Sequence, residues 1–283
     1  FSIQAKSLNN SFLYAKISRH LEQKILETAG AVTVTTAFAL KKYCEQFGEK
    51  AVEKMSVVPP LLHPVPLNPT PTGRGDIERS AKVSRTPLPV GEGSGVGLKI
   101  GYFGALYSPV RTPDAFLDLL EKTFVLRPDW RERLEVHFYG EIFPEFFEKL
   151  SAQPVIWLHG LCSREAAQVA MRDMDILLNI GNTTDFQLPS KAVDYWAAGK
   201  PVVNLSYTDD DPFAAFFGDN KLVFNLKIKN ERVGEGEAER WLAWLDGERK
   251  LPSTTDWERQ IAPYRVEALA RRYFDLLGGE SNS

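Results

Sequence analysis

The sequence predicts an α/β protein with a Rossmann-like, doubly wound parallel sheet. From Leu98 onward, short runs of β-branched and aromatic residues alternate regularly with amphipathic stretches, as in right-handed βαβ units. Several of these runs are apolar almost throughout, which is typical of parallel strands buried on both faces. The chain has 283 residues, 43% hydrophobic and 25% charged, so it can bury a sizeable core and is neither disordered, collagenous nor coiled-coil.

The elements of this sheet are expected in the following order. The strand candidates are Leu98–Phe103, Leu134–Tyr139, Val155–His159, Asp175–Ile180, Pro201–Leu205 and Lys221–Leu226. The helix candidates between them lie at 113–126, 143–151, 163–173, 189–198 and 211–217. In such a sheet, ligands bind beyond the carboxyl ends of the strands.

A smaller α/β piece is expected upstream of this sheet. Its elements are a helix over 5–29 stopped by Gly30, a strand over 31–35, a helix over 37–47 and a strand over 55–58. These form only the end of an α/β unit. We therefore expect an incomplete N-terminal domain, and the first residue, Phe1 rather than Met, fits that expectation.

Four regions are thus predicted: a remnant of the N-terminal domain over 1–60, a linker over 61–97, a second domain over 98–254 and a C-terminal helical region over 255–283. The linker is rich in Pro, Gly and Ser. Its run Gly91–Gly97 resembles a dinucleotide loop but does not follow a strand or open a helix, so it is assigned to the linker. The final helix, Thr255–Leu277, is expected to cross back and pack against residues 5–58.

Charge and cysteine content exclude several classes of function. Lys and Arg number 34 against 37 Asp and Glu, a net charge of −3, so nothing favours a nucleic-acid partner. Cys44 and Cys162 are too few and too distant in sequence for a disulfide framework or a zinc site. Reduced thiols favour a cytoplasmic location. No apolar run approaches the ~20 residues of a membrane span.

The most informative segment runs from Asp175 to Val203 and reads strand, polar loop, helix, strand. Pro189 suits a first helical position and Gly199 a C-terminal stop, which predicts a helix over 189–198. At ~100° per residue one helix face packs and the other presents polar groups. The packing residues are Ala192, Val193 and Trp196; the polar ones are Gln187, Ser190, Lys191 and Asp194.

This polar face lies at a helix N-terminus, where free N–H groups and the dipole favour an anion. Lys191 and the Ser190 hydroxyl could close around a phosphate, and Asp194 could accept hydrogen bonds from sugar hydroxyls. The alternative is an ordinary solvated helix start, since many helices begin with such residues.

The run Gln187–Val203, QLPSKAVDYWAAGKPVV, resembles the donor-binding helix of GT-B fold glycosyltransferases of family 4. Ile100–Leu106 with Arg111, Leu158–Leu161 and Ser163–Glu165 are similar to that family's other donor-site stretches. Ala29–Thr36 and Val57–Pro60 are similar to the end of its acceptor-side domain. The resemblance covers nearly the whole chain and implies that the chain starts inside the last third of the N-terminal domain.

The resemblance also implies roles for individual residues. Ser190 and Lys191 would hold the donor diphosphate, Asp194 the ribose hydroxyls, and Arg111 would supply a second cation at the departing diphosphate. The remaining nucleotide-sugar-binding positions would be Gly104, at the close backbone approach to the phosphates, Leu161, in the base pocket, and Gln187, Leu188 and Pro189.

Two positions depart from the family pattern. A Glu is common eight positions before the residue that matches Asp194, and this chain has Phe186 there, with Asp185 beside it. An Arg is common after the first loop glycine, and this chain has Ala105. How the donor sugar is held is therefore open.

The activity implied is transfer of a hexosyl or deoxyhexosyl group from a nucleotide diphosphate-sugar to a glycan, polysaccharide or lipid-linked acceptor, with retained configuration. No metal and no cofactor are expected. Peripheral membrane contact would come through the absent part of the N-terminal domain. The alternatives are a non-catalytic nucleotide-sugar-binding module or fragment, and another GT-B enzyme such as a nucleotide-sugar epimerase.

Other chemistry-bearing residues have plainer interpretations. His137 and His159 lie on expected strands and read as packing or turn residues. Asp209–Asp211 has the Asp-x-Asp spacing of metal-dependent glycosyltransferases of another fold, but it precedes Pro212 and a helix, which favours helix capping. Trp241 and Trp244, at helical spacing, predict a packing stripe together with Leu245, not a sugar platform.

Overall fold

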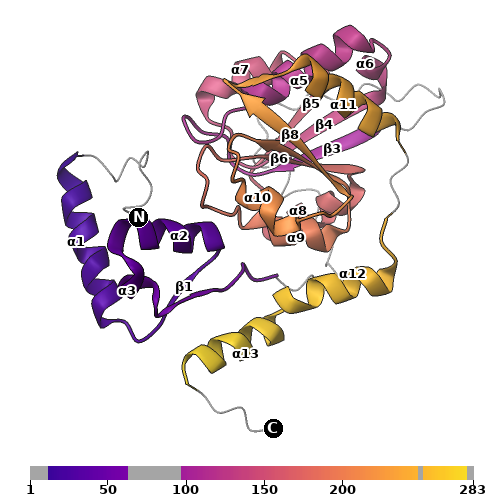
Figure 1. Ribbon diagram of the computed structural model, residues 1–283. Coiled ribbons are helices and arrows are strands. Elements are labelled where there is room, and N and C mark those ends of the chain that lie inside the picture. Colours follow the sequence, from indigo (N-terminus) through magenta and orange to yellow (C-terminus); the bar gives the residue numbers. More distant parts are fainter. Residues whose placement is uncertain (1–11, 63–96, 248–250, 279–283) are drawn as a thin grey trace.

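A computed structural model of the chain describes residues 12–62, 97–247 and 251–278. It shows a small N-terminal lobe beside a larger α/β lobe, with the C-terminal helices running beneath both (Figure 1). The expected linker lies almost entirely outside the described residues, as does the glycine-rich run 91–97 apart from Gly97.

The N-terminal lobe is a short parallel βαβ piece. Its elements are α1 Phe12–Thr28, β1 Val32–Val34, α2 Ala37–Phe47, α3 Glu49–Val52 and β2 Met55–Val57. β1 and β2 pair in parallel, with Val32 opposite Met55. The apolar stripe on α1 is largely uncovered, since Ile17, Leu21 and Ile25 are all more than half exposed. Leu26 instead provides the buried contact of α1 with the small core of this lobe.

The larger lobe contains a seven-stranded sheet in the order β5-β4-β3-β6-β7-β8-β9. Its strands are β3 Leu98–Phe103, β4 Leu134–Tyr139, β5 Ile156–Gly160, β6 Ile176–Ile180, β7 Val202–Ser206, β8 Val223–Lys229 and β9 Arg232–Val233. The first six are parallel and confirm the six predicted strands; the largest shift of an end is from Leu226 to Lys229. β9 is antiparallel to β8, so the expectation of a parallel sheet is corrected at that edge.

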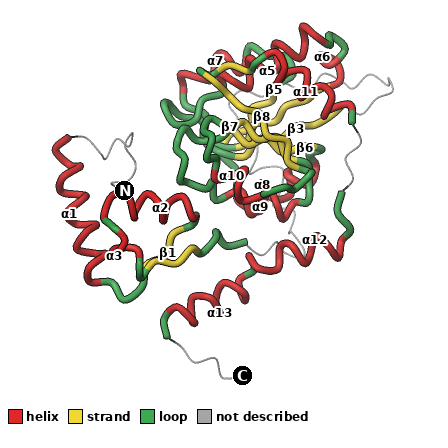
Figure 2. Tube along the Cα trace, in the orientation of Figure 1, coloured by secondary structure: helices red, strands yellow, loops and turns green. Residues whose placement is uncertain are grey.

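Helices cover both faces of this sheet, as the doubly wound prediction requires (Figure 2). They are α5 Asp114–Leu126, α6 Trp130–Arg133, α7 Pro144–Ser151, α8 Arg164–Asp173, α9 Lys191–Ala198, α10 Pro212–Phe217 and α11 Glu235–Asp246. One core cluster contains buried residues of α5, α7 and α11, and a second contains those of α8, α9 and α10. The two clusters lie on opposite faces of the strands.

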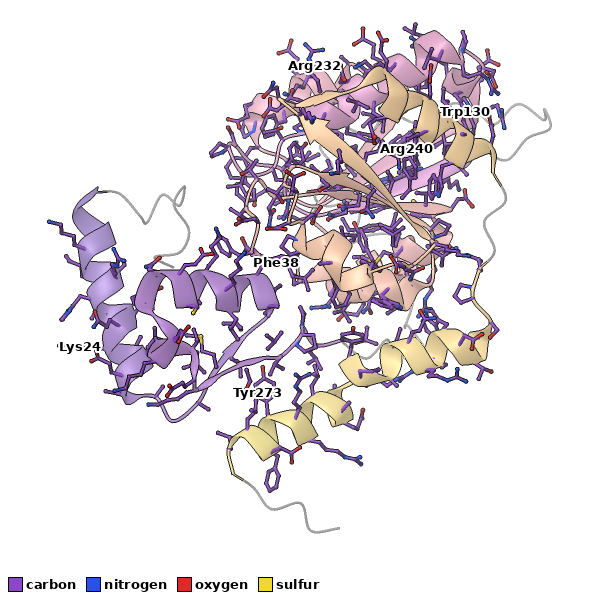
Figure 3. All side chains as sticks on the ribbon, viewed as in Figure 1. Lys24, Phe38, Trp130, Arg232, Arg240 and Tyr273 are labelled. Carbon is purple, nitrogen blue, oxygen red and sulfur yellow. The ribbon has the colours of Figure 1, made fainter. Side chains whose placement is uncertain are left out.

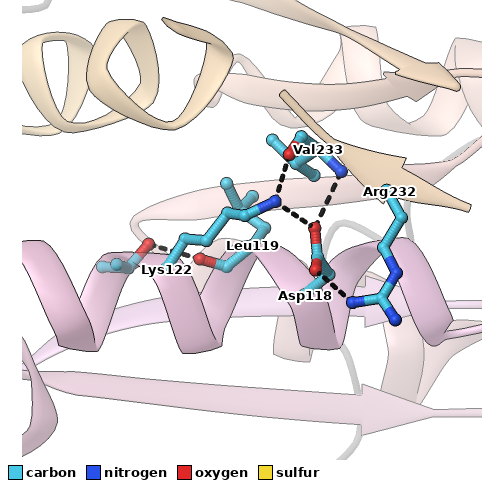
Figure 4. A network of polar contacts seen from close by, with 6 residues as sticks. Asp118, Leu119, Lys122, Arg232 and Val233 are labelled. Atoms are coloured by element: carbon cyan, nitrogen blue, oxygen red, sulfur yellow. Dashed lines mark hydrogen bonds and ion pairs between the residues drawn. The ribbon is translucent and has the colours of Figure 1, made fainter. Parts of the chain in front are cut away.

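A buried carboxylate fastens the β8–β9 hairpin to α5 (Figure 4). Asp118 is 8% exposed and accepts hydrogen bonds from Lys122 Nζ at 2.8 Å, Arg232 Nη1 at 2.9 Å and the Val233 N–H at 2.8 Å. Burial alone would raise the pKa of Asp118, but these donors together hold it below its usual value. The carboxylate is therefore charged and satisfied in its buried position.

The C-terminal region is two helices rather than the single helix predicted over 255–277. α12 spans Thr254–Ile261, a 3₁₀ turn spans Ala262–Tyr264 and α13 spans Val266–Leu276. Pro263 lies in the turn, and its missing N–H ends the helical hydrogen-bond ladder there.

α12 packs on α9, where Ile261 meets Val193 and Leu62 and the Trp257 indole N–H donates to the Trp196 carbonyl at 3.0 Å. The Leu62 N–H donates to the Tyr264 carbonyl at 2.8 Å. α13 continues from there beneath β1 (Figure 1). Packing of the C-terminal region 255–277 against residues 5–58 stays a prediction.

His137 and His159 form a half-buried polar chain on β4 and β5. His159 Nε2 lies 3.0 Å from His137 Nδ1, and His137 Nε2 lies 3.3 Å from a Glu135 oxygen. The Tyr139 ring stacks on His159 at 4.1 Å. Burial, with a smaller contribution from His137, lowers the pKa of His159 to about 4. Both rings are thus neutral packing residues, as their place on strands predicts.

The His137–His159 pair is expected to make the stability of the protein sensitive to mild acid. Because the pKa of His159 is about 4 in the folded protein and ~6.5 in the unfolded chain, its contribution is complete above pH ~6.5 and is lost as pH falls toward 4. The loss should reach up to about 3 kcal/mol. His159→Phe keeps the stacked ring without the titration. Urea unfolding measured between pH 7 and pH 4 should show that the free energy of unfolding falls less steeply in this variant than in the parent. An equal fall in both proteins would show that His159 is not the source of the acid sensitivity.

Candidate functional site

The candidate site lies where the strand order of the large sheet reverses. β3 and β6 are neighbours, but the chain proceeds from β3 toward β5 on one side and from β6 toward β9 on the other. The crevice beyond the carboxyl ends of such a pair is the usual ligand site of doubly wound sheets. Tyr195 of α9 joins the two strands there: its hydroxyl accepts from the Phe103 N–H at 3.1 Å and donates to the Leu178 carbonyl at 3.0 Å.

Gly104 follows β3 in a space that excludes any side chain. A Cβ at Gly104 would lie 2.8 Å from the Tyr102 hydroxyl and 3.5 Å from Arg111 Nη1. Gly140, with φ +128°, lies against it, since a Cβ at Gly140 would come within 2.2 Å of the Gly104 carbonyl oxygen. The two glycines let the loops after β3 and β4 meet beside the Arg111 guanidinium.

Arg111 is brought to this crevice by the loop before α5. Its Nη2 donates to the Asn182 side-chain oxygen at 2.6 Å, and Asn182 follows β6 and is only 8% exposed. Among the described residues, the buried Arg111 Nε has no hydrogen-bond partner. A buried donor without a partner carries a desolvation cost that an anionic ligand would relieve.

Lys191 is the first residue of α9, and Ser190 is its N-cap. The helix thus begins two residues later than predicted. Pro189 lies before it, and the Pro189 carbonyl accepts from the Ala192 N–H at 3.0 Å in a tight turn that leads into the helix. The Ser190 side chain makes no capping hydrogen bond and is exposed. Lys191, expected to be exposed, is half-buried. Burial lowers its pKa, against the opposing effect of Asp194, and Arg111 and Arg164 lower it further.

Asp194 is 8% exposed and is held by Arg164, the first residue of α8. Arg164 Nη2 contacts both carboxylate oxygens, at 3.1 and 2.9 Å. Asp194 also lines a cavity of about 1010 Å³ between α8, α9 and the C-terminal helices. A role for Arg164 was not predicted from the sequence, although its position at the start of a helix after β5 was an available signal.

The remaining predicted residues differ in exposure. Leu161 follows Gly160 at the end of β5 and is 61% exposed, free to face a planar group. Gln187 is exposed and Pro189 is half-buried. Leu188 is 6% exposed in the core cluster of Phe103 and Tyr195. Any contact of Leu188 with a ligand would therefore come from its backbone.

The Asp-x-Asp segment caps a helix, as predicted. Asp211 Oδ1 accepts from the N–H groups of Phe213 and Ala214 at the start of α10. Its other oxygen accepts from Asn204, which is the middle member of a ladder of asparagines across β6, β7 and β8. Sequence reasoning did not find this ladder. Among the described residues, no group of three or more His, Cys, Asp or Glu side chains could hold a metal ion.

No protein-family profile matches the sequence. A search of curated proteins likewise found no match. In the part of the chain that the structure describes, no helix is long and apolar enough to cross a membrane.

Solved structures of glycosyltransferases share the fold. A structure of Staphylococcus aureus TarM, a mutant in complex with fondaparinux, α-GlcNAc-glycerol and UDP, matches with a TM-score of 0.61 at 14% identity, over 95% of this chain and 47% of TarM. Anabaena HepE in complex with UDP matches with a TM-score of 0.61 at 14% identity, over 95% of this chain and 68% of HepE. The pneumococcal O-GlcNAc transferase GtfA, with UDP and GlcNAc, matches with a TM-score of 0.56 at 12% identity, over 91% of this chain and 47% of GtfA.

This chain therefore spans about half the length of TarM and GtfA and about two thirds of HepE. The chain has the α/β fold of the GT-B glycosyltransferases.

Proposed function

We propose that the protein binds a nucleotide diphosphate-sugar and transfers its sugar to a hydroxyl acceptor. The observation that carries this proposal is the convergence of Arg111 and Lys191, with Arg164 close by, on the crevice between β3 and β6. The positive end of the α9 dipole adds to their positive potential. A diphosphate, with several negative oxygens, is the ligand that such a group of donors fits.

The chemistry would be displacement at the anomeric carbon. The bond from this carbon to the diphosphate oxygen breaks, and its electron pair leaves with the diphosphate. The acceptor hydroxyl oxygen forms the new bond on the face that the diphosphate leaves, as retention requires. Its proton passes to the departing diphosphate oxygen. Arg111 and Lys191 would stabilise the negative charge that develops on the leaving diphosphate, in proportion to how far the bond has broken.

The finer features of this activity are also proposals. Because Arg111 and Lys191 can neutralise the diphosphate, we propose a reaction that needs no divalent metal. We propose retained configuration and a glycan, polysaccharide or lipid-linked acceptor from the resemblance in sequence to family 4. The UDP present in the solved TarM, HepE and GtfA structures makes UDP the first nucleotide to test.

A non-catalytic nucleotide-sugar-binding module is the second candidate, favoured by one observation. Phe186 occupies the position where family 4 enzymes often carry a Glu, and its side chain is buried in the N-terminal lobe rather than facing the crevice. The module would bind the nucleotide by the same cations but would lack a group for the sugar.

Calorimetric titration with UDP, ADP and GDP, beside an assay for hydrolysis of UDP-glucose, separates these proposals. Saturable binding of a nucleoside diphosphate is expected, with slow donor hydrolysis that EDTA does not change. Binding without hydrolysis would favour the module. If none of the three nucleotides binds, both proposals are refuted. Activity that is lost in EDTA and restored by Mn²⁺ would refute metal independence.

A further inference from the structure

The segment between β6 and α9, residues 181–190, is the donor loop of the proposed site. Its Phe186 is 8% exposed, yet it is buried in the neighbouring lobe. The side chain belongs to the core cluster of Leu26, Val34, Ala39 and Met55, all from the N-terminal lobe. The larger lobe thus contributes one side chain to the small core of the other lobe.

Two polar contacts fix the same stretch of backbone on the N-terminal lobe. The Thr36 hydroxyl, which accepts from the Ala39 N–H at 2.9 Å as the N-cap of α2, donates to the Phe186 carbonyl at 2.7 Å. Lys42, one turn further along α2, pairs with Asp185 at 3.2 Å. Phe38 marks the end of α2 nearest the larger lobe (Figure 3). The contacts of Thr36 and Lys42 therefore fix both the position and the direction of the loop at residues 185 and 186.

The other end of the donor loop holds the proposed catalytic cation. The Asn182 side-chain oxygen accepts from Arg111 Nη2 at 2.6 Å. The Thr183 N–H lies 3.4 Å from the Val110 carbonyl, a second and weaker link to the Arg111 segment. Only three residues separate Asn182 from Phe186, so a shift of the Phe186 anchor must be taken up within one short stretch of backbone.

We propose that Phe186 is a positioning residue, through which the N-terminal lobe holds the donor loop and thereby the Asn182–Arg111 pair. This inference rests on the proposed function. If Phe186 served only to fill the core of the N-terminal lobe, a residue of that lobe's own helices or strands could do the same. Here it comes from the loop at the crevice, and its backbone is tied by Thr36 and its neighbour Asp185 by Lys42. The position of the N-terminal lobe would in this way set the geometry of the diphosphate site.

Phe186→Ala tests this inference by UDP titration and by hydrogen exchange without nucleotide. The substitution frees the donor loop from the N-terminal lobe. If the freed loop keeps its binding-competent arrangement about a tenth of the time, the apparent affinity for UDP falls about tenfold. Amides of 181–187 and of 105–112 should exchange faster in the variant, since local opening of both segments becomes easier. Phe186→Leu keeps an apolar anchor and should restore both readouts.

Met55→Ala is the matched control, because Met55 is buried in the same cluster at the start of β2 and belongs to the N-terminal lobe. It should lower the unfolding midpoint of this lobe as much as Phe186→Ala while leaving UDP affinity and loop exchange as in the parent. Parent-like affinity and exchange in Phe186→Ala, or equal changes in Met55→Ala, would overturn the inference. If the parent binds ADP or GDP in place of UDP, that nucleotide replaces UDP in the titration. If the parent binds none of the three, the proposed function fails, and the exchange comparison still decides whether Phe186 anchors the loop.

Discussion

Replacing Lys191 with alanine is expected to weaken UDP binding by about 1.5–3 kcal/mol, the range for a hydrogen bond to a charged group. Turnover of a UDP-sugar should fall further, by roughly 10²–10³-fold, because charge grows on the diphosphate as the anomeric bond breaks. Titration calorimetry measures the first effect, and the rate of donor hydrolysis at saturating donor measures the second. Arg111→Ala should behave in the same way.

Loss of Lys191 should not destabilise the fold. The side chain is half-buried, and burial lowers its pKa despite the opposing effect of Asp194, with smaller lowering by Arg111 and Arg164. Without a bound anion its charge is therefore unfavourably placed. The thermal midpoint of Lys191→Ala should equal or exceed that of the parent. Lys221→Ala, an exposed lysine before β8, is the control for a simple loss of charge. Equal UDP affinity in Lys191→Ala and the parent would remove Lys191 from the site.

The sheet was predictable because its strands are buried on both faces. Mostly apolar runs such as Ile176–Ile180, in which Asn179 is the one polar residue, leave few alternatives, and β6 is buried throughout. β9 was missed for a physical reason. It has two residues and follows a turn in which Asn230 and Glu231 both have positive φ. Asn-Glu lacks the glycine that usually marks such hairpins, so the sequence carries little signal for it.

The site was predictable only in part. The helix start with Ser190 and Lys191 could be found because helix boundaries have local signals. The pairing of Arg164 with Asp194 joins residues 30 apart on two helices, and no local pattern encodes it. The burial of Phe186 in the other lobe likewise depends on tertiary structure. A Phe beside an Asp in a polar loop does not indicate which core its side chain enters. The break at Pro263 did have a local signal, namely the proline itself.

Replacing Trp241 with alanine is expected to destabilise the larger lobe by about 3–5 kcal/mol, as for other buried aromatic side chains. The indole is fully buried and packs against Phe224 and Trp244, with ring centroids 6.1 and 5.5 Å away. Its N–H donates to the Thr123 hydroxyl at 3.2 Å. The substitution therefore opens a cavity between α11, α5 and β8 and also leaves Thr123 without this donor.

Chemical unfolding in urea gives the size of this effect, and UDP titration shows where it acts. Trp241 packs on the α5–α11 face of the sheet, whereas α9 lies on the other face, so UDP affinity of the folded variant should match the parent. Trp244→Ala, which truncates a half-buried neighbour on the same helix, should cost less stability. A large loss of donor binding with nearly unchanged stability would instead make this tryptophan pair a ligand platform. Because Trp241 has no exposed surface in the folded protein, a ligand could reach it only after the packing of α11 had opened, and the loss of stability is the result we expect.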